Sequence, residues 1–171
     1  VWLVPVAMFT AMLLAFNAWQ AMRHEDRTVM GETIAILGLT LTAPTAYYVC
    51  RGEWGSSALL LWALCILYFT SSVFYVKLRV HSLNHRREEL RKRSWRRCAL
   101  YHLFLITALV LLAITRSTNV FVLMAFGPVL ARAFWLLAKP AKQASLKQVG
   151  VLEIIYSAVF LLFVTIGVRG L

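Results

Sequence analysis

The stretch CALYHLFLITALVLLAIT, Cys98–Thr115, decides the fold of this chain. It contains no Asp, Glu, Lys or Arg, and its polar side chains are few and small apart from His102. About 20 residues of apolar helix are needed to cross the hydrocarbon core of a bilayer. The stretch therefore predicts a transmembrane helix.

The rest of the chain has the same character. Of its 171 residues, 61% are hydrophobic and 15% charged, and the mean hydropathy is +0.73, which excludes an ordinary soluble domain. Alternating β-barrel patterns are absent, and uniformly apolar runs satisfy their backbone groups in lipid as helices. We therefore predict an all-α, polytopic transmembrane helical bundle, a single domain over residues 1–171. Five further spans are expected at Val1–Met22, Glu32–Cys50, Ser56–Val76, Asn119–Ala138 and Val149–Val168, which makes six in all.

The positive charge is concentrated in one segment, KLRVHSLNHRREELRKRSWRR, Lys77–Arg97, which holds nine of the 18 Lys and Arg residues. In a soluble protein such a segment would suggest nucleic-acid binding, but here it separates two spans. The first, third and fifth loops are basic, whereas the opposite loops hold only Arg51, Arg116 and Arg169. The positive-inside rule places the basic loops in the cytoplasm of a bacterial inner-membrane protein, with Val1 and Leu171 on the other side. No nucleic-acid partner is expected.

The basic segment is also expected to touch anionic lipid. Its RREELRKR part can form a helical extension in which Glu88 and Glu89 lie within reach of Arg91, Lys92 and Arg93. Its excess positive charge would attract anionic headgroups. The predicted lipid contacts are Arg86, Arg87, Arg91, Lys92, Arg93, Arg96 and Arg97.

Six polar residues fall in the cytoplasmic third of the predicted spans. Ionisable groups inside spans are candidates for function, and this one-sided clustering favours a cytoplasm-facing pocket for a lipid or quinone-like headgroup. A structural alternative stays open, in which Lys77 and Arg132 reach the interface and Glu153 pairs with Arg132 to neutralise it. The candidate pocket residues are Asn17, Glu32, Lys77, His102, Arg132 and Glu153.

No residue pattern predicts a catalytic centre, a metal site or a cofactor. His102 could ligate a haem or chlorophyll metal, but no second histidine lies in a span, which favours a hydrogen-bonded packing role. Cys50, Cys65 and Cys98 show no metal or disulfide spacing. Replacing His102 is accordingly expected to matter only if the pocket binds a ligand.

Four segments resemble the YwiC-like family of bacterial polytopic membrane proteins: APTAYYV (43–49), LYFTSSVFYVKLRV (67–80), ALYHLFL (99–105) and LKQVGVLEIIYSAVFLL (146–162). The resemblance implies that further spans precede this region, so that it would be the C-terminal part of a larger membrane protein. It also implies a layout similar to UbiA-type intramembrane prenyltransferases. The family's residues would correspond to Glu32, Tyr75, Lys77, His102, Gly150, Glu153 and Ser157.

Two functions follow as the main alternatives, beside a transporter, with which helices broken at Pro44 and Pro128 would be compatible but for which no half-to-half symmetry is visible. The first is a non-catalytic accessory subunit that binds lipid or a quinone-like molecule and packs against other subunits of a membrane energy-transducing, electron-transfer complex. The second is a divergent UbiA-like transferase acting on an isoprenoid or lipid. In that case Lys77, His102 and Arg132 would bind the anionic group, and Glu32 or Glu153 would act as base.

Overall fold

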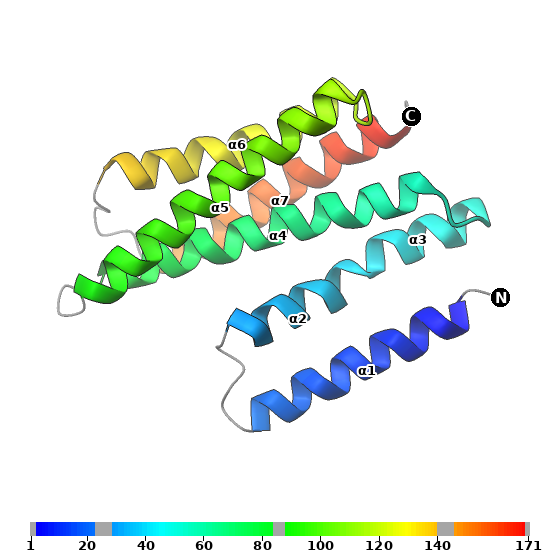
Figure 1. Cartoon of the computed structure of the whole chain (residues 1–171), viewed down its shortest axis with the longest axis horizontal. Helices are drawn as coiled ribbons and strands as arrows, with labels where there is room; N and C mark the ends of the chain where they lie inside the picture. Colours follow the sequence, from blue (N-terminus) through cyan, green and yellow to red (C-terminus); the bar gives the residue numbers. More distant parts are fainter. Residues whose placement is uncertain (1–2, 23–28, 84–87, 140–145, 170–171) are drawn as a thin grey trace. The chain divides into compact units, whose positions relative to one another are not determined.

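The computed structural model describes residues 3–22, 29–83, 88–139 and 146–169, which are helical apart from short turns (Figure 1). No described residue lies in a β-strand, which confirms the all-α prediction. The helices are α1 (Leu3–Met22), α2 (Val29–Thr40), α3 (Thr42–Arg51), α4 (Ser56–Leu83), α5 (Glu88–Ile114), α6 (Val120–Ala138) and α7 (Leu146–Arg169).

Within the part of the chain that the structure describes, five helical segments are long and apolar enough to cross a membrane. They are Gly31–Arg51, Ser56–Ser82, Glu88–Ile114, Val120–Ala138 and Lys147–Val168. These segments match five of the six predicted spans, and the protein is a multi-pass membrane protein. The first predicted span corresponds to a shorter apolar helix, Leu3–Trp19, within α1.

The segment Gly31–Arg51 contains a break between α2 and α3. Pro44 has no backbone N–H, and a proline ring clashes with the carbonyl four residues earlier, at Thr40. Helix α2 ends at Thr40, and α3 begins at Thr42. The helix is therefore interrupted next to Pro44, whereas α6 continues unbroken past Pro128.

The basic segment is more helical than its interpretation as a loop predicted. Helix α4 continues to Leu83, beyond the expected end at Val76, and α5 begins at Glu88 rather than at Cys98. The charged first turns of α5 are supported by ion pairs from Glu88 to Arg91 and Lys92. A change from apolar to charged residues marks where a span leaves the membrane, but not where the helix ends, because helical hydrogen bonds persist in water when side chains support them.

The residue contacts divide the chain into two compact units, Val1–Thr70 (unit 1) and Ser71–Leu171 (unit 2). In unit 1, α1 packs against α2, and the α4 residue Trp62 donates a hydrogen bond from Nε1 to the Thr40 hydroxyl oxygen of α2 (3.1 Å). In unit 2, α5 packs against α6, and α6 against α7. The interior of unit 2 contains Leu105, Phe126 and Val129, all essentially inaccessible to solvent.

Candidate functional site

Arg132 lies at the centre of the polar cluster in unit 2. Its side chain, on α6, is only 5% exposed, and its Nη1 group donates to Oε1 of Glu153 on α7 in a salt bridge. Its Nη2 group donates to the hydroxyl oxygen of Ser72 on α4 at 2.8 Å. A buried charge is tolerated only when it is paired and hydrogen-bonded, and these contacts meet that need. The pairing of Glu153 with Arg132, one part of the structural alternative, is present.

Two tyrosine rings complete the surroundings of this guanidinium. Its Cζ atom lies 4.6 Å from the ring centre of Tyr75 on α4 and 4.8 Å from that of Tyr156 on α7. Cation–π attraction is strengthened where water is excluded. Ser72 and Tyr75 are three residues apart, as are Glu153 and Tyr156, so each helix turns two side chains towards Arg132. The cluster joins α4, α6 and α7.

One nitrogen of the Arg132 guanidinium takes no part in this arrangement. Its Nε atom is buried and has no hydrogen-bond partner among the described residues. A guanidinium offers five N–H donors in a planar fork, so an unfilled position next to a carboxylate could serve an acceptor oxygen.

His102, on α5, forms a second buried hydrogen-bonded pair, with Ser71 of α4. Its Nδ1 lies 2.8 Å from the backbone carbonyl oxygen of Cys98, and because a carbonyl can only accept, Nδ1–H is the donor. In the neutral ring Nε2 then accepts from the Ser71 hydroxyl of α4, 2.9 Å away. With both nitrogens occupied, His102 is a hydrogen-bonded packing residue, as its isolation among the spans favoured.

The six predicted pocket residues are divided between the two units. Lys77, His102, Arg132 and Glu153 belong to unit 2, where only Arg132 and Glu153 form a direct pair with each other among the contacts described above. Asn17 of α1 and Glu32 of α2, both half-buried, belong to unit 1.

Three residues of these clusters were missed by the sequence-based prediction: Ser71, Ser72 and Tyr156. Serine in an apolar helix ordinarily bonds to its own backbone, so Ser71 and Ser72 gave no signal of their own. The usable signal was spacing, because Tyr156 lies three residues beyond Glu153 and thus on the same face of its helix.

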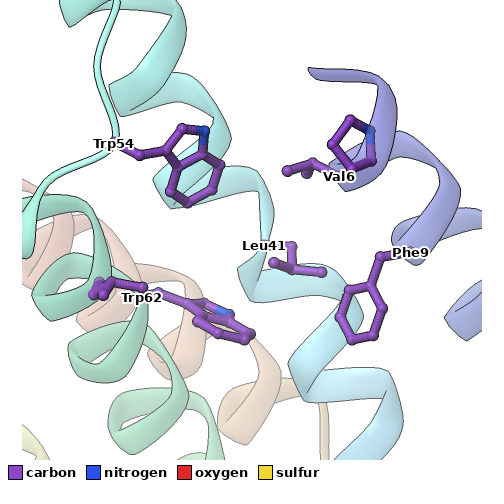
Figure 2. A pocket seen from close by; sticks show the side chains of 7 residues that line it. Val6, Phe9, Leu41, Trp54 and Trp62 are labelled. Carbon is purple, nitrogen blue, oxygen red and sulfur yellow. The ribbon is translucent and has the colours of Figure 1, made fainter. Parts of the chain in front are cut away.

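Unit 1 contains an apolar cavity of about 440 Å³. Figure 2 shows Val6 and Phe9 of α1 on one side, Trp54 and Trp62 on the other, and Leu41, at the break between α2 and α3, between them. Pro5 and Leu59 complete the lining. Asn17 is eight residues beyond Phe9 on α1, which is about 12 Å along a helix, and neither Asn17 nor Glu32 is among the residues that line the cavity.

The seven predicted lipid-contacting residues differ in their surroundings. Arg86 and Arg87 lie outside the described residues. Glu88 and Glu89 pair with Arg91 and Lys92, as predicted, but the predicted pairing does not extend to Arg93. Arg93, Arg96 and Arg97 are exposed. Within the described ranges no group of three or more His, Cys, Asp or Glu residues could hold a metal ion.

Comparison with known proteins finds a protein similar to this chain. The chain is 26% identical over 167 residues to a protein of Haemophilus influenzae described as "Uncharacterized protein". The match covers 97% of this chain and 64% of the relative, so the chain spans somewhat less than two thirds of that protein's length. No family model and no solved structure matches the chain.

Proposed function

We propose that the protein is a non-catalytic integral membrane subunit that packs against other membrane proteins of a larger complex. The observation that carries this proposal is the engagement of Arg132, whose guanidinium contacts Glu153, Ser72, Tyr75 and Tyr156. A charged group committed to partners on two neighbouring helices is suited to holding those helices together. A catalytic charge, by contrast, must face a substrate.

The outer surfaces of the helices also support a subunit role. Leu103 on α5 and Ile154 and Leu161 on α7 are between 63% and 71% exposed. Apolar side chains of this size at membrane depth face lipid or another helix. These surfaces could therefore contact lipid on one side and a helix of another subunit on the other. An electron-transfer complex in the bacterial inner membrane is the host that we propose.

The predicted headgroup pocket belongs to the same proposal. The buried Nε of Arg132 offers one donor, and the Glu153 side chain, 19% exposed, borders the cluster. An acceptor oxygen of a lipid or quinone-like headgroup would suit this donor. Binding would then be auxiliary to the structural role of the cluster.

The cavity of unit 1 favours a second candidate, a transferase acting on an isoprenoid or lipid. Its volume of about 440 Å³ and its lining of aromatic and aliphatic side chains would suit a hydrocarbon chain. Under this candidate the cavity would bind the chain of the substrate, and the reacting group would lie elsewhere.

Purification of the protein from its own membranes at natural abundance distinguishes the two candidates. We would extract it in two mild detergents and identify proteins and lipids by native mass spectrometry. Redox subunits present in the same stoichiometry in both detergents would support the subunit function. An isolated chain carrying an isoprenoid diphosphate would overturn it in favour of the transferase, and an isolated chain with neither would contradict both.

A further inference from the structure

Helix α5 has two opposite faces with different environments. Cys98, His102, Leu105 and Leu109 are buried inside unit 2 and recur at the spacing of one helix face. At 100° per residue, the opposite face contains Arg93, Arg96 and Arg97 and then, one turn further on, Leu100 and Phe104. These five residues are exposed, Leu100 by 64% and Phe104 by 59%.

The positive charges on this face differ in their ion pairing from the cations beside them on the helix. Lys92 Nζ lies 3.3 Å from Glu88 Oε1 and 3.7 Å from Glu89 Oε1, so both carboxylates of the helix start are engaged by Lys92. Among the described residues, no carboxylate forms an ion pair with Arg93, Arg96 or Arg97. Residues three and four apart on a helix are neighbours, so the three guanidinium groups can converge on one anion.

Aromatic contacts indicate the depth of this face in the membrane. Trp95 Nε1 donates to the backbone oxygen of Leu137, near the end of α6, at 3.2 Å. At the same end of α6, the Lys139 ammonium lies 4.4 Å from the centre of the Trp135 ring. Tryptophan concentrates at the level of lipid headgroups. Arg93, Arg96 and Arg97 are then at headgroup level, and Leu100 and Phe104 at the level of the acyl chains.

We propose that this face of α5 is a binding site for one anionic phospholipid. The phosphate lies between Arg93, Arg96 and Arg97, and an acyl chain runs along Leu100 and Phe104. Charge complementarity and the direct continuation of the cationic part into an apolar stripe argue for this occupant, because a phospholipid has both parts in the same order. The site is distinct from the Arg132 cluster and does not depend on the proposed subunit function.

Native mass spectrometry of the full chain in detergent tests the proposal. We would titrate the protein with phosphatidylglycerol and, in parallel, with phosphatidylcholine carrying the same acyl chains. The wild type is expected to retain one phosphatidylglycerol and to prefer it to phosphatidylcholine. The double variant Arg96→Gln/Arg97→Gln is expected to bind phosphatidylglycerol about tenfold more weakly or worse.

The helix provides a matched control in Arg91→Gln/Lys92→Gln. This variant removes the same number of positive charges from the same helix, but from residues that pair with Glu88 and Glu89. It is expected to retain wild-type affinity, because the proposed site excludes Arg91 and Lys92 from the broader set of lipid contacts predicted from the sequence. Equal losses in both double variants would show diffuse electrostatic attraction instead of a site and would overturn the proposal.

Two further results would also overturn it. Equal affinity for the two lipids would show that the headgroup charge is not recognised. Retention of a protein instead of phosphatidylglycerol, lost in Arg96→Gln/Arg97→Gln, would assign the face to a protein partner. A Leu100→Gln/Phe104→Gln variant tests the apolar half, with weaker phosphatidylglycerol binding expected, and circular dichroism verifies that each variant is folded.

Discussion

At the scale of single residues, the pairing of Arg132 shows how a charge is accommodated between apolar helices. Removing an ion from water costs several kcal/mol, and the cost is offset only when the partner and the remaining hydrogen bonds are in place. Glu153 supplies the opposite charge, and Ser72 accepts one further hydrogen bond. The stability of unit 2 should therefore depend on both members of the pair.

Glu153→Gln tests this dependence. The substitution preserves the shape of the side chain but leaves the Arg132 charge buried without compensation, and we expect the free energy of unfolding to fall by about 3–5 kcal/mol. Thermal or SDS-induced unfolding in detergent measures the change. Glu89→Gln is the control, because the Glu89 side chain is 91% exposed, and it should shift stability by less than about 0.5 kcal/mol. Equal effects of the two variants would contradict the structural role.

The buried pair of His102 and Ser71 leads to a second expectation. Ser71→Ala removes the hydroxyl that donates to Nε2 and should cost about 1 kcal/mol, whereas His102→Ala also leaves a cavity and should cost about 2 kcal/mol or more. Thr107→Ala, at an exposed position of the same helix, is the control. Unfolding of the three variants without any added ligand is the measurement.

This expectation corrects the one drawn from the sequence, by which His102 would matter only if a ligand bound. The side chain is 1% exposed and hydrogen-bonded through both ring nitrogens. Its loss should therefore lower the stability of the protein even without a ligand. Wild-type stability of the His102→Ala variant would restore the earlier interpretation.

At the scale of the elements, the crossing of α6 and α7 depends on a glycine. A Cβ atom added at Gly167 would lie 2.6 Å from Cγ2 of Val122 and 3.2 Å from its backbone nitrogen. Small residues permit such close approach of membrane helices. The approach fixes how the two helices meet at the end opposite to the Arg132 cluster.

Gly167→Ala should therefore separate the helices. We expect a loss of about 1–3 kcal/mol in stability from overpacking. Gly150→Ala on the same helix is the matched control, because nothing lies within 4 Å of its added Cβ, and it should be neutral or gain up to about 1 kcal/mol in helix propensity. Comparison of the two unfolding curves in one detergent tests this prediction. A Gly167→Ala variant of unchanged stability would show that α6 and α7 can move apart without cost.

The elements also show where reasoning from sequence succeeds. The spans were predictable because length and apolarity are properties of a continuous segment. A distortion of the helix near Thr40 was predictable from Pro44, because proline cannot donate a backbone hydrogen bond to the carbonyl four residues before it. The extension of α5 back to Glu88 was anticipated by its charge spacing, but the extension of α4 to Leu83 was not.

At the scale of the whole molecule, the orientation in the membrane remains a prediction that follows from the distribution of Lys and Arg. Cys50, exposed near the end of α3, should lie on the outside, whereas Cys98 is buried. A membrane-impermeant maleimide applied to intact cells should therefore label the wild type and fail to label Cys50→Ser. Adding Glu89→Cys to Cys50→Ser should give labelling only in inside-out vesicles. The reverse pattern would invert the topology.

The sequence by itself determined that this is an all-α membrane protein, because burial in lipid requires long apolar helices whatever their neighbours are. It also left few acidic partners for Arg132, because the chain contains only seven Asp and Glu residues. Only the tertiary structure decided that Glu153, Ser72 and two tyrosines surround Arg132 and that His102 belongs to another pair. The physical reason is that lipid-facing and protein-facing sides of a helix are equally apolar, so the rotation of each helix is set by packing and not by hydropathy.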